Sequence, residues 1–195
     1  MSEVLARVLD TADSGVGGGS AAALAGAMAA GLAGLVARLS SGRDCGLDDA
    51  RYAEILAECE VLARELGDGA REDAEAYGLV AAAYRLSRDG AGAEARAAAI
   101  GEALIAAAEA PLRNAGRTLR VRELCAELEG RSNATAASDL VIAALLADAG
   151  VRGCLMNVGV NTCMLGGSPA AARLNGEADA VRATHERLTT LKEAT

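Results

Sequence analysis

The 195-residue sequence contains no phenylalanine and no tryptophan, and its aromatic side chains are three tyrosines. Lysine occurs once, at Lys192, and the net charge is −8. With no basic tract and almost no aromatic groups for stacking on bases, the chain does not fit a nucleic-acid-binding protein. Valine, isoleucine and threonine are also sparse, whereas alanine and leucine dominate, so the composition predicts helices throughout.

Metal ligands and disulfide pairs are scarce as well. The only histidine, His185, stands in a charged C-terminal segment, and we expect it at the surface. No cluster of His, Cys, Asp or Glu has the spacing of a metal site, so we predict no metal. The cysteines are odd in number and form no Cys-x-x-Cys pair, which predicts small buried side chains in a reducing compartment. They are Cys45, Cys59, Cys125, Cys154 and Cys163.

The N-terminal residues do not resemble a signal peptide, because the stretch from Met1 to Asp10 is short and charged. We therefore expect a cytoplasmic protein.

One long uncharged stretch lies between Asp13 and Arg38 and is the only segment that suggests a membrane span. Alanine and glycine favour lipid weakly, and no basic cluster precedes it, so we expect a closely packed buried helix over about 20–39 and no membrane partner. Two sets of residues recur at helical spacing. The residues with large side chains are Leu24, Met28, Leu32, Leu35 and Val36. The small residues are Ala22, Gly26, Ala30 and Gly34.

The start of this stretch is rich in glycine. Gly17, Gly18 and Gly19 precede Ser20, a residue type that caps helix N-termini. Free N–H groups and the positive end of a helix dipole at this turn could hold an anion or a carbonyl. No Lys-Ser or Lys-Thr follows, so the turn is not a P-loop. A simple tight turn that admits a closely packed helix explains these glycines equally well.

Helical periodicity continues along the chain. It predicts helices over 3–9, about 47–86, 93–108 and 112–128, an apolar helical run from 140 to 165, and a last helix over 170–193. Gly67 and Gly69 are expected to interrupt the long segment, and Pro111 to separate two helices, because proline does not fit deep inside one. We expect Asp148 and Arg152 to pair one turn apart. The arginines expected to face outward are Arg113, Arg117, Arg120 and Arg122.

These segments predict one all-α domain over residues 1–195, an up-and-down bundle of long helices. Because an alanine-filled core buries little area per residue, we also expect a homo-oligomer.

A few polar residues stand out within the apolar pattern. Asp73 and Tyr77 lie one turn apart, either as a carboxylate oriented by a phenol or as part of a solvated face. Asp139 opens a helix, where a negative charge complements the dipole. Asn157 and Asn161 share a face of the apolar run, and buried amides are costly unless paired. They either cross-link helices or line a polar cleft, and we favour the cleft.

Three motifs, in order, resemble those of the cyclodeaminase/cyclohydrolase family. They are Gly-Gly-Gly-Ser-Ala-Ala-Ala-Leu-Ala-Gly from Gly17, Asp-Ala-Glu-Ala-Tyr from Asp73, and Asn133 with Ser138-Asp139 and Asn-Val-Gly-Val-Asn from Asn157. This family comprises the C-terminal domain of formiminotransferase-cyclodeaminase and the free-standing methenyl-tetrahydrofolate cyclohydrolases. The resemblance covers nearly the whole chain, and the segment around Pro111 matches too.

The resemblance implies a dimer-forming helical fold with a folate cleft at or near the subunit interface. Residues matching the motifs would line it: Gly17, Gly18, Gly19, Ser20, Asp73, Tyr77, Asn133, Asp139, Asn157 and Asn161. Val16 replaces the family's usual proline and Ser132 its usual glycine. The family's basic residues after the second helix are reduced to Arg38 and Arg43, and Arg43 is our candidate for the glutamate carboxylates of folate.

The implied reaction is hydrolysis of methenyl-tetrahydrofolate to the formyl compound. The methenyl group is an electrophilic amidinium cation, so a positioned water and a base such as Asp73 or Asp139 suffice for its hydrolysis. The substrate is thus a tetrahydrofolate derivative, and no tightly bound cofactor is expected. The absence of a fused transferase segment favours this activity over cyclisation of formimino-tetrahydrofolate with release of ammonia. A non-catalytic helical dimer that binds a folate or a protein is the third hypothesis. We expect a homodimer or a dimer of dimers.

Overall fold

The computed structural model describes residues 3–87 and 92–193, with side chains as far as residue 189. Within these ranges the chain forms six α-helices and one short 3-10 helix, and no strand. They are α1 (Glu3–Leu9), α2 (Gly18–Ser40), α3 (Asp49–Tyr84), α4 (Gly92–Leu128), η1 (Ala134–Ala136), α5 (Ala137–Met164) and α6 (Pro169–Glu193). The predicted loop over 87–92 falls largely outside the described residues.

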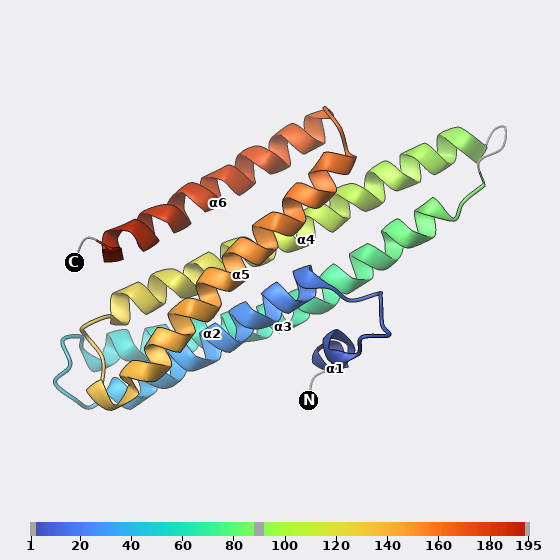
Figure 1. Cartoon of the computed structure of the whole chain (residues 1–195). Helices are drawn as coiled ribbons and strands as arrows, with labels where there is room; N and C mark the ends of the chain where they lie inside the picture. Colours follow the sequence, from blue (N-terminus) through green and yellow to red (C-terminus); the bar gives the residue numbers. More distant parts are fainter. Residues whose placement is uncertain (1–2, 88–91, 194–195) are drawn as a thin grey trace.

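Helices α2 to α6 alternate in direction, which confirms the predicted all-α up-and-down bundle (Figure 1). Helix α2 lies at the centre, against α3, α4 and α5, while α6 covers α4 and α5. Helices α3 and α4 are the longest and extend together beyond the other helices (Figure 1).

The small residues of α2 face the bundle core, and of its large residues Val36 is fully buried there too. A Cβ atom added at Gly26 would lie 2.4 Å from Thr118 Oγ1 of α4, and one at Gly34 would lie 3.1 Å from Cys59 Cβ of α3. Met28, from the set of large residues, is half exposed. The predicted close packing through the small residues is therefore confirmed, whereas the large residues divide between the core, where Val36 is fully buried, and the outer side of the helix, where Met28 lies.

Helix α4 continues through Pro111, so the expected break there is wrong. Proline has no N–H for the carbonyl four residues earlier, which is that of Ala107. In this fold Asn161 Nδ2 of α5 donates to the Ala107 oxygen instead, at 2.8 Å. Tertiary packing thus replaces the missing helical hydrogen bond.

Helix α3 likewise runs without interruption past Gly67 and Gly69. Gly69 serves packing rather than interruption: Asn114 Nδ2 of α4 donates to its carbonyl at 3.1 Å, and an added Cβ would lie 2.0 Å from Asn114 Oδ1.

A buried polar cluster joins α4, α5 and α6 and overturns three expectations. Arg122 is fully buried rather than outward, and its Nε donates to Asp148 Oδ1 at 3.0 Å. His185 is buried rather than at the surface, with Nε2 2.8 Å from the same oxygen. Asp148 therefore pairs across helices and not with Arg152. The periodicity of α4 alone did not reveal that α6 folds back over it.

A row of ion pairs connects α3 and α4. The α3 members are spaced seven residues apart, so they lie on one edge of the helix. The pairs are Arg51–Glu127 at 2.7 Å, Glu58–Arg120 at 2.6 Å, Glu65–Arg117 at 3.0 Å and Glu72–Arg113 at 3.2 Å. Exposed pairs of this kind each contribute little to stability.

All five cysteines are free, and three of them match the expected burial. Burial raises the pKa of the Cys59 and Cys154 thiols to about 12, which leaves them unreactive at neutral pH. Cys45 is only half-buried and Cys163 is exposed, contrary to expectation.

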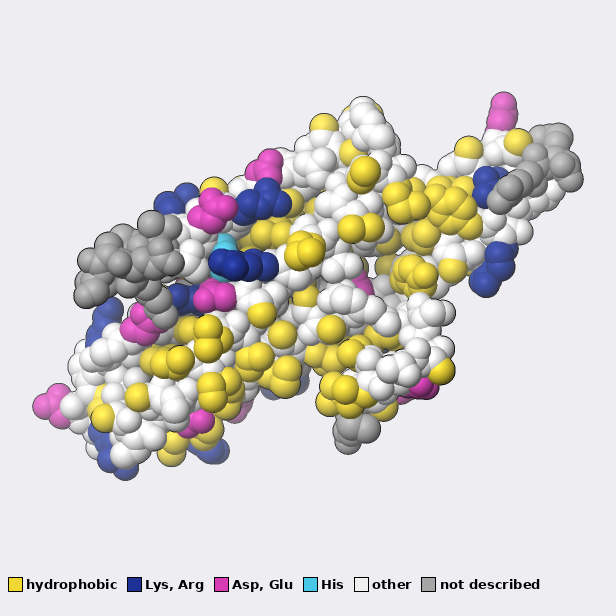
Figure 2. Space-filling model, in the orientation of Figure 1, with side chains coloured by type: hydrophobic (Ala, Val, Ile, Leu, Met, Phe, Trp, Pro, Cys, Tyr) yellow, Lys and Arg dark blue, Asp and Glu magenta, His cyan; other side chains and the backbone are white. Residues whose placement is uncertain are grey.

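Two described helical segments, and not one, are long and apolar enough to cross a membrane by length and composition alone. Such a test is also passed by core helices of soluble proteins, and 56% of the relevant window of Gly18–Ser40 is buried within the bundle. In Ala134–Met164 only 39% of the corresponding window is buried. Hydrophobic side chains gather on the face of the molecule shown in Figure 2. One side of α5 therefore presents exposed apolar side chains, among them Val141, Leu145 and Met156.

Gly26→Ala should destabilise the fold by about 1–3 kcal/mol, because the added methyl group overlaps Thr118 in a closely packed core. Chemical denaturation would measure the loss. Gly31→Ala is the matched control: apart from its own helix backbone and chain neighbours, no atom lies within 4 Å of its added Cβ, so stability should hold or rise by up to about 1 kcal/mol. If Thr118→Ala fails to reduce the cost of Gly26→Ala, the overlap is not its cause.

Candidate functional site

A cavity of about 520 Å³ opens where the N-terminus of α2 meets the C-terminal halves of α3 and α5. Its volume falls in the range of small-molecule sites. Residues predicted from the sequence make up much of the lining: Gly17, Gly18, Gly19, Asp73, Tyr77, Asn157 and Asn161. The remainder is Ser14, Gly15, Ala74, Val80, Ala81, Tyr84, Ala107, Val160 and Met164.

The glycine turn places a carboxylate at the start of α2. Gly17, and not Ser20 as expected, is the N-cap residue of the helix. Ser20 is buried in the first turn, and its Oγ donates to Asp73 Oδ2 at 2.8 Å. A Cβ added at Gly19 would lie 2.5 Å from Asp73 Oδ1, so only glycine leaves room for this carboxylate.

The carboxyl group of Asp73 lies under opposing electrostatic influences. Burial raises its pKa above the ordinary value, while hydrogen bonds from the side chain and backbone of Ser20 lower it. Burial is the larger effect, so the net direction is upward. A desolvated carboxylate of this kind is a stronger base than an exposed one, which is a property of carboxylates that take part in proton transfer.

Two amides from α5, Asn157 and Asn161, also line the cavity. Asn157 Nδ2 donates to the Gly153 carbonyl at 2.9 Å. Asn161 Nδ2 donates to the carbonyls of Ala107 at 2.8 Å and Asn157 at 3.0 Å. The two alternatives left open by the sequence both apply to Asn161, because it links α5 to α4 and also lines the cavity.

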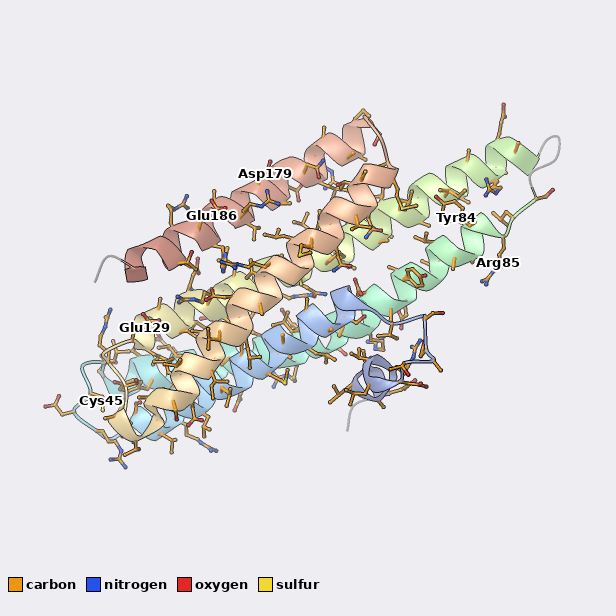
Figure 3. The ribbon with its side chains drawn as sticks, viewed as in Figure 1. Cys45, Tyr84, Arg85, Glu129, Asp179 and Glu186 are labelled. Carbon is orange, nitrogen blue, oxygen red and sulfur yellow. The ribbon has the colours of Figure 1, made fainter. Side chains whose placement is uncertain are left out.

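The remaining wall is apolar and aromatic. Tyr77 and Tyr84 are both on α3, and Tyr84 lies near its C-terminal end (Figure 3). Val160 and Met164 of α5 add apolar surface. Sequence reasoning missed Tyr84, although it follows Tyr77 by seven residues and so occupies the same helix face two turns later.

The segment before α2 borders the cavity through Ser14 and Gly15, which sequence reasoning also missed. Asp13 fixes this segment: its carboxylate accepts from Gly15 N at 2.7 Å and from Arg7 Nε at 2.7 Å. These contacts, with the Arg7 guanidinium first, hold the pKa of Asp13 below its usual range. No residue of this segment carried a motif that would have marked it.

Three predicted site residues lie at the other end of the bundle, around the C-terminus of α2 and the first turn of α5. The loop after α2 is the one that contains Cys45, labelled in Figure 3. Arg43 is exposed in the loop after α2. Asn133 donates from Nδ2 to the Leu39 carbonyl at 3.1 Å and from its N–H to Ser40 Oγ at 2.9 Å. Asp139 is in the first turn of α5, 18 residues (157 − 139) and therefore about 27 Å before Asn157. Within a single chain, therefore, none of these three residues lies at the cavity: Arg43, Asn133 and Asp139.

Among the described residues, no group of three or more His, Cys, Asp or Glu side chains is placed to hold a metal ion. The titratable side chains that line the cavity are Asp73, Tyr77 and Tyr84.

Asp73→Asn should raise the thermal stability of the protein at neutral pH. The folded-state pKa of Asp73 lies above 3.8, so its ionised form opposes folding, and an amide can still accept the hydrogen bond of Ser20. The gain should shrink as the pH falls through the folded-state pKa, because the wild-type carboxylate then becomes neutral. Melting temperatures of both proteins across this pH range test the sign. A less stable Asn variant at neutral pH would show that the Ser20 hydrogen bonds outweigh burial.

Comparisons with known proteins agree with the fold and the motifs. Over 138 residues the chain is 36% identical to methenyltetrahydrofolate cyclohydrolase of Methylorubrum extorquens, a match that spans 70% of this chain and 66% of that protein. The crystal structure of formiminotetrahydrofolate cyclodeaminase from Thermotoga maritima superposes with a TM-score of 0.78 at 25% identity, covering 88% of this chain and 83% of that one. The family model described as formiminotransferase-cyclodeaminase matches residues 2–180, and the chain therefore belongs to this family of folate-processing helical proteins.

Proposed function

We propose that this protein hydrolyses methenyl-tetrahydrofolate to formyl-tetrahydrofolate. The observation that carries the proposal is the half-buried carboxylate of Asp73, held by Ser20 at the wall of a cavity large enough for a folate head group. The relative named as a cyclohydrolase supports this choice of reaction.

The proposed chemistry needs one base. Asp73 accepts a proton as water adds to the methenyl carbon, which forms a carbon–oxygen bond and a neutral tetrahedral carbinolamine. The bond from that carbon to one folate nitrogen then breaks, the nitrogen takes up a proton, and the hydroxyl group loses its proton as the formyl carbonyl forms. One proton is released overall. Before the reaction, ionised Asp73 stabilises the cationic substrate.

The cavity walls suit the remaining parts of a folate. Tyr77 and Tyr84 offer faces for an aromatic or pterin ring. Arg96 lies over the ring of Tyr84, 5.6 Å from its centroid, and places a cation beside the cavity that could meet a glutamate carboxylate. We propose a substrate folate without a tightly bound cofactor or metal, in a cytoplasmic protein that binds neither nucleic acid nor membrane.

Cyclisation of formimino-tetrahydrofolate is the alternative, favoured by the likeness to the Thermotoga maritima cyclodeaminase. That reaction needs an acid for the departing ammonia. Asp73 is the one carboxylate that lines the cavity in the described structure, and its raised pKa would let it carry this proton.

We further propose a homodimer formed through the exposed apolar side of α5 and α2. Its large exposed side chains are Met28, Leu39, Val141, Ile142, Leu145, Met156, Val160 and Met164. A second copy explains this surface better than a membrane does, because Arg152 projects from the middle of the same side of α5.

Two-fold symmetry accounts for the distribution of the motifs. If two α5 helices cross antiparallel near residue 150, Leu145 of one copy meets Met156 of the other, and Asp139 approaches the level of Asn161. The second copy would then bring its Arg43, Asn133 and Asp139 toward this cavity. This arrangement keeps all the predicted residues as candidates for one site shared by two chains.

Asp73→Asn should lower the hydrolysis rate about 10²- to 10⁴-fold, the usual loss for a general base. The absorbance of methenyl-tetrahydrofolate follows the reaction, and ammonia release from formimino-tetrahydrofolate tests the alternative. Asp68→Asn on the exposed face of α3 is the matched control and should leave the rate unchanged. If the wild-type protein consumes neither compound faster than buffer does, the non-catalytic hypothesis replaces both.

Leu145→Glu should convert the dimer to a monomer, since it puts a charge into the proposed apolar contact. Light scattering coupled to size exclusion would report the mass. Leu79→Glu, a similarly exposed leucine on α3, should leave the dimer intact.

Asp139→Asn should reduce activity only if the second copy completes the site, so an unaffected rate would remove Asp139 from it.

A further inference from the structure

The proline inside α4 lies one turn from the cavity. In an α-helix each N–H donates to the carbonyl four residues earlier. Pro111 has no N–H, so the carbonyl of Ala107 has no such donor, and Ala107 is itself part of the cavity lining. The structure therefore exposes a backbone acceptor beside the cavity at a point where a regular helix would have none.

The side-chain amide of Asn161 donates to this carbonyl oxygen, and its hydrogen bonds determine how the amide is oriented. One Nδ2 hydrogen is directed to the Ala107 oxygen at 2.8 Å and the other to the Asn157 oxygen at 3.0 Å. Rotating the amide by half a turn would set its oxygen against two carbonyl oxygens, so the orientation is determined by its partners. The Oδ1 atom has no hydrogen-bond partner among the described residues, and the side chain lines the cavity.

We propose that Pro111 is a positioning residue for the reaction: by freeing the Ala107 carbonyl, it fixes Asn161 with Oδ1 as an acceptor for an N–H group of the ligand. This inference rests on the proposed function, in which the tetrahydropterin ring supplies such N–H groups. Asp73 and Asn161 then present acceptors from different helices, and the cavity selects a ligand that donates hydrogen bonds to both.

The effect of replacing Pro111 on stability can be separated from its effect on ligand binding. Proline inside a helix is unfavourable, so its replacement by alanine should stabilise α4 and restore the helical bond to Ala107. The new N–H would compete with Asn161 for that carbonyl. Stability and ligand binding should consequently change in opposite directions.

The test is a double-mutant cycle on the full chain with methenyl-tetrahydrofolate. Pro111→Ala should keep or raise Tm, raise KM about 3- to 10-fold as expected for one hydrogen bond, and leave kcat nearly unchanged. Asn161→Ala should raise KM as well, and Pro111→Ala should add nothing in that background. Pro169→Ala is the matched control, because Pro169 begins α6, where no helical N–H partner is lost.

Two outcomes would overturn the inference in an active protein: an unchanged KM in Pro111→Ala, or the same increase in both backgrounds. Failure of the proposed function is recognised separately, because the wild type would then turn over neither folate. In that case the side-chain amide protons of Asn161, assigned by their loss in Asn161→Ala, provide the test by NMR. They should exchange slowly in the wild type and faster in Pro111→Ala, and equal exchange rates would refute the positioning.

Discussion

The close approach of α2 to its neighbours is the constraint on which the rest of the structure depends. At the contact points α2 has glycine, so side chains of the neighbouring helices fill the space that a side chain of α2 would otherwise occupy. Thr118 of α4 occupies the place of a Cβ at Gly26, and the Asp73 carboxylate occupies that place at Gly19. The same property therefore forms the core in the middle of the helix and the candidate site at its N-terminus.

The cavity is built from regular helices and not from long loops. Ser20, Asp73 and Asn161 come from α2, α3 and α5, and each is fixed by a hydrogen bond to another helix or to a neighbouring carbonyl. Sites on such elements hold their geometry well. The partial burial of the Asp73 carboxylate is costly to the fold, and this cost is compatible with a role in proton transfer, where a raised pKa is useful.

The sequence predicted the helices and about half of the cavity, because both depend on local spacing. Gly17 to Gly19, Asp73, Tyr77 and the two asparagines were found from motifs and from polar residues in apolar runs. The continuity of α4 through Pro111 and the burial of His185 were not predictable in this way. Both depend on partners far along the chain: Asn161 of α5 for the first, and Asp148 for the second. The resemblance grouped three further residues with the cavity, but in one chain they lie at the other end of the bundle: Arg43, Asn133 and Asp139.

The ion pairs between α3 and α4 have a consequence for folding accuracy. Three of the four pairs have glutamate on α3, but Arg51–Glu127 is reversed. A shift of the hairpin by seven residues would bring Arg51 toward Arg120 in one direction, or Glu58 toward Glu127 in the other. Like charges disfavour both misaligned pairings. A shift of this size would move Asp73 by about 10 Å relative to α4, so one reversed surface pair protects the alignment of the catalytic candidate.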